Sequence, residues 1–154
     1  MDNFQKVISP DIVDVLRHEH EQIRQLCTDV RGSGRERKKR SLAALRQAVH
    51  RHQLGERAVA HPPVADSGPD GGDIARACHA EAEQIERSLS ELGRLGTEHA
   101  DFDAGFVALS AALLAHAAHQ ERDEFPLLRR YVPPQRLHMM ASTMHDIQIM
   151  DRQR

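Results

Sequence analysis

The sequence predicts an all-α protein, an up-down-up-down four-helix bundle with an additional C-terminal helix. Apolar residues recur at spacings of three and four along five stretches of the 154-residue chain, which is typical of helices that bury one face. The chain has four Phe, one Tyr and no Trp, so its core must come from Leu, Ile, Val, Ala and Met, a set that favours helices. A chain of this length is expected to form one domain.

Charge and cysteine content argue against several classes of protein. The formal net charge is -2, which speaks against a main role in coating nucleic acid or an acidic membrane. The basic run at residues 35–40 has no interleaved aromatic residues and fits a solvated helix start. Cys27 and Cys78 have no CxxC spacing and follow no secretory leader, which predicts reduced thiols in a cytoplasmic protein. No apolar run approaches the roughly 18 residues that span a bilayer, so we expect a soluble chain.

The first helix is expected to open the bundle, which we place at residues 10–131 after an N-terminal arm at residues 1–9. Ser9-Pro10-Asp11 supplies a helix start, with a capping hydroxyl and proline in the first turn. One face of this helix is apolar at every position but one: Val13, Leu16, His20, Ile23, Cys27 and Val30. A histidine in the middle of a core face is either a neutral imidazole bonded to a carbonyl or buried acid, or a ligand.

The second helix is expected from residue 35 to about His61, where Pro62-Pro63 stops it. Residues 62–72 are rich in proline and glycine and are expected to form a loop. The inner face of this helix is apolar until His52 and, one turn later, Glu56. Burial without a partner costs about 2 to 7 kcal/mol for a neutral polar group and more for a charge. Some partner must therefore satisfy both groups.

The third helix is expected to start near Asp73 and to end by Gly93. His79 and Glu83 share one flank of it at HxxxE spacing, where His79 can lean inward and Glu83 less easily.

The fourth helix is expected to begin at residue 98 or 101, and its inner face stays apolar until His116, just before a cluster of acids. After Pro133-Pro134, residues 132–154 have the spacing of an amphipathic helix. That helix would cover the bundle or pair with another subunit.

Antiparallel packing would bring these polar groups together in the core of the bundle, a known place for metals held by facing side chains. Imidazoles mixed with carboxylates, without clustered thiolates, suit iron, manganese or zinc. The candidates exceed the four ligands of a closed zinc site, and a carboxylate can bridge two ions, so two metals fit better than one. The candidate ligands are His20, His52, Glu56, His61, His79, Glu83, His116 and Glu121.

Several of these residues resemble the hemerythrin-like (HHE cation-binding) domain family over about residues 10–130, with mycobacterial and other actinobacterial members nearest in pattern. The residues that carry the resemblance are His20, His52-Gln-Leu-Gly-Glu56, and His116 with Glu121 before Phe125-Pro126. The resemblance implies a four-helix bundle that holds two iron ions with an oxo or hydroxo bridge, in preference to manganese or zinc.

Each match implies a role. His20 is similar to the lone histidine of the family's first helix. His52 and Glu56 match the HxxxE of the second helix, whose glutamate bridges the irons. His116 and Glu121 match the HxxxxE or HxxxxD of the fourth.

The third helix departs from the family pattern. The family carries HxxxH there, whereas Ala82 stands at the second histidine and His79 is one step out of register with the first, although His79 with Glu83 would give an HxxxE variant. His61 is a candidate replacement ligand, since mycobacterial members of the family place a tyrosine there. A regular helix turns it about 140° away from Glu56, and the alternative is a helix-end histidine that meets exposed carbonyls.

Glu121 has the same offset of about 140° from His116 in a regular helix. Its assignment therefore rests on the resemblance, and periodicity alone would choose His119 or Gln120.

The resemblance also implies a small-molecule ligand, which would be dioxygen, peroxide or nitric oxide at an open iron position. Loss of an imidazole favours the ferric state, which fits catalase-like peroxide decomposition or nitric oxide handling better than reversible oxygen carriage. Whether the protein is an enzyme stays open: one alternative is a non-catalytic iron or oxygen sensor that reports through the fifth helix, and another is a bundle without metal, suggested by Ala82. We expect a monomer or homodimer with no nucleic acid or membrane partner.

Overall fold

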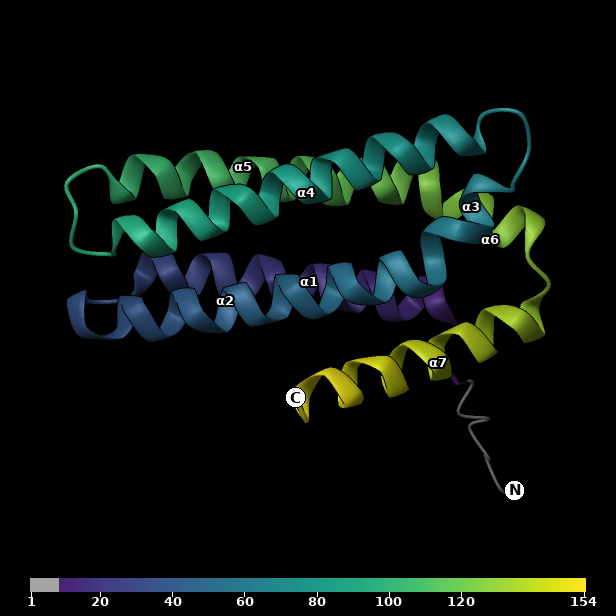
Figure 1. Ribbon diagram of the computed structural model, residues 1–154, viewed down its shortest axis with the longest axis horizontal. Helices are drawn as coiled ribbons and strands as arrows, with labels where there is room; N and C mark the ends of the chain where they lie inside the picture. Colours follow the sequence, from purple (N-terminus) through teal and green to yellow (C-terminus); the bar gives the residue numbers. More distant parts are fainter. Residues whose placement is uncertain (1–8) are drawn as a thin grey trace, which may run out of the picture.

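The computed structural model describes residues 9–154, and every regular element in that part of the chain is helical. Four long helices lie side by side and run alternately up and down (Figure 1). They are α1 (Ile12–Gly32), α2 (Arg35–Gly55), α4 (Gly71–Leu95) and α5 (Phe102–His119). The C-terminal helix α7 (Pro134–Arg152) packs against α1 and α2. The predicted four-helix bundle with one further helix is confirmed; the predicted arm, apart from Ser9, lies outside the described residues.

Helix α1 begins two residues later than the sequence predicted. Asp11 is the N-cap: its Oδ1 accepts a hydrogen bond from Asp14 N at 2.9 Å, and Asp14 Oδ2 accepts one from Asp11 N at 3.1 Å. This reciprocal pair satisfies two backbone donors at once. Ser9 and Pro10 precede the helix because the carboxylate of Asp11, and not the Ser9 hydroxyl, reaches the free N–H groups.

Two of the long helices widen by one residue immediately before a proline. Helix α2 continues through the π-helical turn η1 (Glu56–Ala60) into α3 (His61–Ala65), and His61 N donates to Glu56 O. In a regular helix the ring of Pro62 would clash with the carbonyl four residues earlier and leave it without a donor. The wider turn, closed by a bond over five residues, accommodates the proline. The predicted stop at Pro62-Pro63 is therefore wrong, and the loop shrinks to residues 66–70.

The second widened turn repeats this arrangement at the other end of the sequence. Helix α5 continues through η2 (Gln120–Glu124) into α6 (Phe125–Tyr131), Phe125 N donates to Gln120 O, and Pro126 follows. Both turns lie at the same end of the bundle (Figure 1). Beyond each π turn, the positions whose side chains face the core are shifted by one residue.

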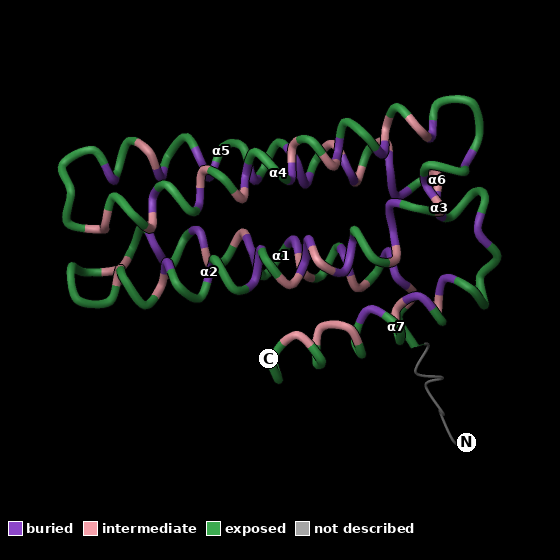
Figure 2. The backbone as a smooth tube through the Cα atoms, in the orientation of Figure 1, coloured by how far each residue is buried: buried purple, intermediate pink, exposed green. Residues whose placement is uncertain are grey.

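The apolar core consists of two clusters, and buried residues line the inner side of every long helix (Figure 2). One cluster lies toward the α1–α2 and α4–α5 turns and includes Val30, Leu45 and Phe102. The other lies toward α3, α6 and α7 and includes Leu16, Phe125 and Met144. Along α1, α2 and α5, buried polar side chains separate the two clusters. We call them the polar layer: His20, His52, Gln53, Glu56, His61, His116, Gln120 and Glu124.

A glycine lets α7 approach the bundle beside the polar layer. A Cβ atom on Gly55 would lie 2.5 Å from Cε of Met144, which is fully buried. We expect Gly55→Ala to lower the free energy of unfolding by about 1 to 3 kcal/mol, as overpacking does. Urea unfolding measures this, with Gly32→Ala as the control, because nothing lies within 4 Å of a Cβ at Gly32. Equal stability of the two variants would contradict the predicted contact.

The helical run Phe102–Tyr131 is long and apolar enough to cross a membrane by length and composition alone. The expectation that no apolar segment has this length is therefore wrong. The observation is weak evidence for a membrane, because core helices of soluble proteins pass the same test. Here Phe106, Leu109 and Leu113 of that run are buried in the bundle.

Candidate metal centre

Three buried imidazoles, one from each of α1, α2 and α5, have their outer nitrogen beside a carboxylate. The Nδ1–Oε1 pairs are His20–Glu121 at 3.1 Å, His52–Glu19 at 2.9 Å and His116–Glu81 at 2.8 Å. A carboxylate only accepts hydrogen bonds, so each Nδ1 carries a proton and each Nε2 is the ring nitrogen that faces the interior. Carboxylates orient metal-binding histidines in this way.

The inner nitrogens of these imidazoles face the polar layer. His20 Nε2 lies 3.1 Å from His52 Nε2 and 3.1 Å from Gln120 Oε1, and His116 Nε2 has no hydrogen-bond partner. In the metal-free chain the proton of His52 lies between the two imidazoles, where a cation could replace it. His20, His52 and Glu56 together offer ligand atoms that all lie within 4.8 Å of one another.

Glu56 lies between two of the imidazoles and is fully buried. Its Oε1 is 2.8 Å from His52 Nε2, and its Oε2 is 3.9 Å from His61 Nε2. Neither oxygen has a partner with hydrogen-bond geometry. A carboxylate with two free oxygens, each turned to a different imidazole, suits a bridge between two ions.

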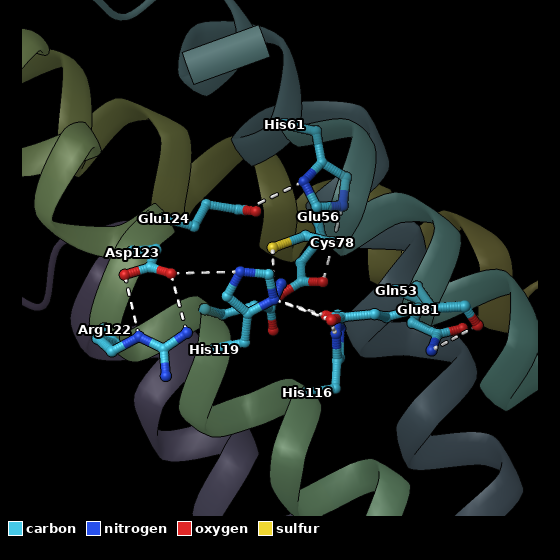
Figure 3. A network of polar contacts seen from close by, with 12 residues as sticks. Gln53, Glu56, His61, Cys78, Glu81, His116, His119, Arg122, Asp123 and Glu124 are labelled. Carbon is cyan, nitrogen blue, oxygen red and sulfur yellow. Dashed lines mark hydrogen bonds and ion pairs between the residues drawn. The ribbon is translucent and has the colours of Figure 1, made fainter. Parts of the chain in front are cut away.

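His61 and Glu124 complete the polar layer, and Figure 3 shows them facing each other. His61 Nδ1 lies 3.0 Å from Glu124 Oε1, and both side chains are buried. The π turn η1 turns His61 toward the inner face of the bundle. In a regular helix the same residue would point away from that face. The sequence analysis missed Glu124, although Phe125-Pro126 repeats the pattern of His61-Pro62 and marks the second π turn.

Glu121 lies outside the group formed by the inner Nε2 atoms of His20, His52 and His116. Its Oε1 accepts from His20 Nδ1 and its Oε2 lies 3.4 Å from a nitrogen of Arg24, while the side chain is 24% exposed. Burial raises the pKa of Glu121. His20 and Arg24 lower this pKa by a larger amount, so the net shift is downward. Gln120, which helical spacing indicated, takes the inner place next to His20 instead.

His79 and Glu83 lie on the outer flank of α4, where the His79 ring meets the ring of His61 edge-on at 6.1 Å between centroids. Their side chains are 43% and 50% exposed and pair with each other at 3.0 Å. Cys78 and Ala82 take the inner face instead. Cys78 was assigned to the core as a packed thiol, yet its sulfur lies among the polar groups in Figure 3. Burial raises its pKa, and the neighbouring carboxylates, Glu124 first, raise it further.

The charges of Glu56 and His20 suit metal ligands, whereas His52 holds a proton that a metal ion would have to displace. Burial opposes a charge on His52, but Glu56 and Glu19 outweigh burial and raise the pKa of His52 to about 10. Burial would raise the pKa of Glu56 as well, yet the imidazoles, His52 above all, lower it to about 2. Burial and His52 lower the pKa of His20. Glu56 is therefore anionic and His20 neutral at pH 7, as ligands must be.

The buried polar atoms without partners give the clearest indication of a cation. They are both oxygens of Glu56 and Glu124, both ring nitrogens of His61, His116 Nε2, Gln120 Nε2 and Gln53 Oε1 within the polar layer. Glu56 Oε1 and Glu124 Oε1 still face the imidazoles of His52 and His61 as ion pairs, and each atom outside these pairs costs about 1 to 3 kcal/mol if it stays unsatisfied. Most are acceptors grouped in one place, so a cation satisfies several together.

The comparisons with known proteins identify the family and the fold. The hemerythrin HHE cation binding domain model matches residues 11–128. A solved structure of a hemerythrin HHE cation binding domain-containing protein from Mycobacterium kansasii has a TM-score of 0.79 and 20% identity, over 90% of this chain and 88% of that chain. Among curated proteins, no relative matches the chain. Because the family model covers most of the sequence, the chain belongs to the hemerythrin HHE cation binding domain family, whose members bind metal ions, typically iron.

Proposed function

We propose that the polar layer holds two iron ions and that the protein decomposes peroxide there. The observation that supports this most is the set of buried donors whose lone pairs have no partner. The proposed ligands are His20, His52, Glu56, His61, His116 and Glu124, with Glu56 as the bridge. His79 and Glu83 have no part in this set, and Glu121 orients His20 from outside. A bound iron pair would supply redox-active centres that cycle between the ferrous and ferric states.

Two ions fit the donor set better than one. Six ligand side chains exceed the four of a closed tetrahedral site. Four of them form two groups, with His20 and His52 on one side of Glu56 and His61 with Glu124 on the other. Imidazoles with carboxylates favour iron over soft metals.

A small cavity beside the polar layer limits the size of the substrate. Its volume is about 20 Å³, and its walls include Ile23, Val49 and Leu113 together with His20, His52 and His116. A space of this size holds about one small molecule. The small volume excludes larger molecules.

Gln53 favours peroxide over dioxygen or nitric oxide. Its Nε2 donates to Ala82 O at 3.3 Å, and its Oε1 has no partner while the residue lines the same cavity. A free acceptor can hold the O–H of hydrogen peroxide, which neither dioxygen nor nitric oxide offers. The chain would thus bind and orient a protic ligand.

Metal analysis and an ultraviolet-visible spectrum of freshly purified protein test the cofactor, and an oxygen electrode tests the activity. We expect two irons per chain, a near-ultraviolet band of an oxo-bridged ferric pair, and oxygen evolution on addition of peroxide. Iron-loaded protein that leaves peroxide unchanged would rule out the catalytic proposal.

Iron affinity is expected to rise with pH. His52 must lose its proton to bind iron and, with a pKa of about 10, holds that proton through the neutral range. Glu56, with a pKa of about 2, is already ionised there. The proton displaced from His52 predicts an affinity gain of about tenfold per pH unit below pH 10, and His61, whose pKa is also raised, despite burial, by Glu124 and Glu56, makes the dependence steeper at the acidic end. Ferrous ion titrations at pH 6, 7 and 8 measure this, and an affinity independent of pH would contradict it.

A non-catalytic sensor is the second candidate function, and the contacts of α7 favour it. Glu19, which holds His52 Nδ1, also accepts a hydrogen bond from Gln148 of α7 at 2.9 Å. Met144 of α7 covers Gly55, the residue before Glu56. A change at the metal would reach α7 through these contacts. A large iron-dependent change in the protease resistance of α7, without peroxide turnover, would support the sensor over the enzyme.

A further inference from the structure

We propose a second metal site at the solvent edge of the polar layer, formed by Cys78, Glu81 and His119 and suited to one divalent cation of zinc-like preference. Both oxygens of Glu81 lie 2.9 Å from His119 Nδ1, and Cys78 Sγ lies 3.8 Å from the same nitrogen. One ligand atom from each of the three lies within 4.8 Å of the others. Figure 3 shows the three side chains turned toward one another.

The orientation of His119 is fixed from its far side. His119 Nε2 lies 3.3 Å from Asp123 Oδ2, and Arg122 pairs with the same carboxylate at 3.0 Å. His119 therefore lies between two carboxylates, and a proton on each ring nitrogen would satisfy both in the metal-free chain. A cation would replace the Nδ1 proton on the side of Glu81, while Asp123 would keep the Nε2 proton and support the ligand from behind.

The donor types indicate the class of metal. A thiolate, an imidazole and a carboxylate make three protein ligands and leave a fourth position for water, as in open tetrahedral zinc sites. The sulfur selects zinc or cobalt over magnesium or calcium. On binding, the cation replaces the proton of the Cys78 thiol, which passes to solvent, and no electron is transferred.

The site is separate from the proposed iron ligands but touches them. Cys78 is fully buried, whereas the Glu81 and His119 side chains are 40% and 19% exposed, so a cation can arrive from solvent. None of the three belongs to the six proposed iron ligands. Glu81 Oε1 also lies 2.8 Å from His116 Nδ1, so the two sites share one carboxylate as a neighbour.

Titration of the metal-free full chain with Co²⁺ tests the proposal, because cobalt bound to a thiolate gives a charge-transfer band that histidine and carboxylate ligands do not give. We expect this band to saturate at one equivalent. Cys78→Ser should abolish it, and Cys27→Ser should keep it, since Cys27 lies buried in the other half of the bundle. Asp123→Asn, which removes no ligand, should weaken the binding by about 10- to 100-fold.

Three results would overturn the second site. The band could be missing from the unaltered chain, it could persist in Cys78→Ser, or Cys78→Ser could also empty the iron site, which would make Cys78 a ligand of the iron pair. Circular dichroism of each variant shows that it folds. Peroxide turnover is scored separately, so an active chain without the cobalt band contradicts only the second site, and an inactive chain with the band contradicts only the catalytic proposal.

Discussion

A Glu56→Ala chain is expected to lose its iron and with it all oxygen evolution from peroxide. Glu56 is the fully buried carboxylate between His52 and His61, and its removal takes away both the proposed bridge and the negative charge that balances the cations. Partners that merely orient a ligand cost about 10- to 100-fold in metal affinity when removed, so the loss here should exceed about a hundredfold. Iron analysis after dialysis and an oxygen electrode measure the two effects.

Glu83→Ala is the matched control for this experiment. Glu83 is also a glutamate four residues after a histidine, but it is half exposed and paired with His79 on the outer flank of α4. This variant should keep its iron and its activity. Equal losses in the two variants, or full iron retention in Glu56→Ala, would contradict the proposed ligand set.

Removal of the iron is expected to lower the midpoint of thermal unfolding by about 8 to 16 °C. A ligand present at about 1,000 times its dissociation constant stabilises the folded state by about 4.1 kcal/mol, and 1 kcal/mol corresponds to about 2 to 4 °C in a domain of this size. The physical cause is the group of buried acceptors that have no partner without the cation. Thermal circular dichroism of the iron-loaded and chelated chains measures the shift.

Equal midpoints with and without iron would favour the third interpretation, a bundle that has lost its metal. Ala82 at the position of a family histidine suggested that interpretation. His20→Leu provides a further check. If a cation is required, the variant should be less stable than the iron-loaded chain, because it loses a ligand; no loss of stability would favour the bundle without metal.

Helical periodicity was sufficient to predict where most of the polar layer lies. His20, His52 and His116 each interrupt an apolar face, and antiparallel packing alone brings them to one level of the bundle. The same reasoning failed beyond the two π turns, because one extra residue per turn shifts the inner face. His61 therefore turns inward, and Glu124 occupies the interior that Glu121 was expected to share.

The remaining discrepancies arise from side chains whose role depends on their neighbours. A buried cysteine looks like any small apolar residue in a sequence, so Cys78 gave no signal until Glu81 and His119 were placed beside it. His79 and Glu83 have a ligand-like spacing, yet a rotation of a fraction of a turn leaves them at the surface. In both cases a proline stands two residues after the end of the π turn, as Pro62 and Pro126. A sequence search could use this feature to find such turns.

The division of the core into two clusters has a consequence for how the protein opens. The clusters meet across the polar layer, which in the metal-free chain is held by ion pairs such as His52–Glu56 and His61–Glu124 and has no continuous apolar packing. Amide hydrogen exchange should then show two cooperative units instead of one. The half that contains α3, α6 and α7 should exchange first, and iron should merge the two halves into one unit.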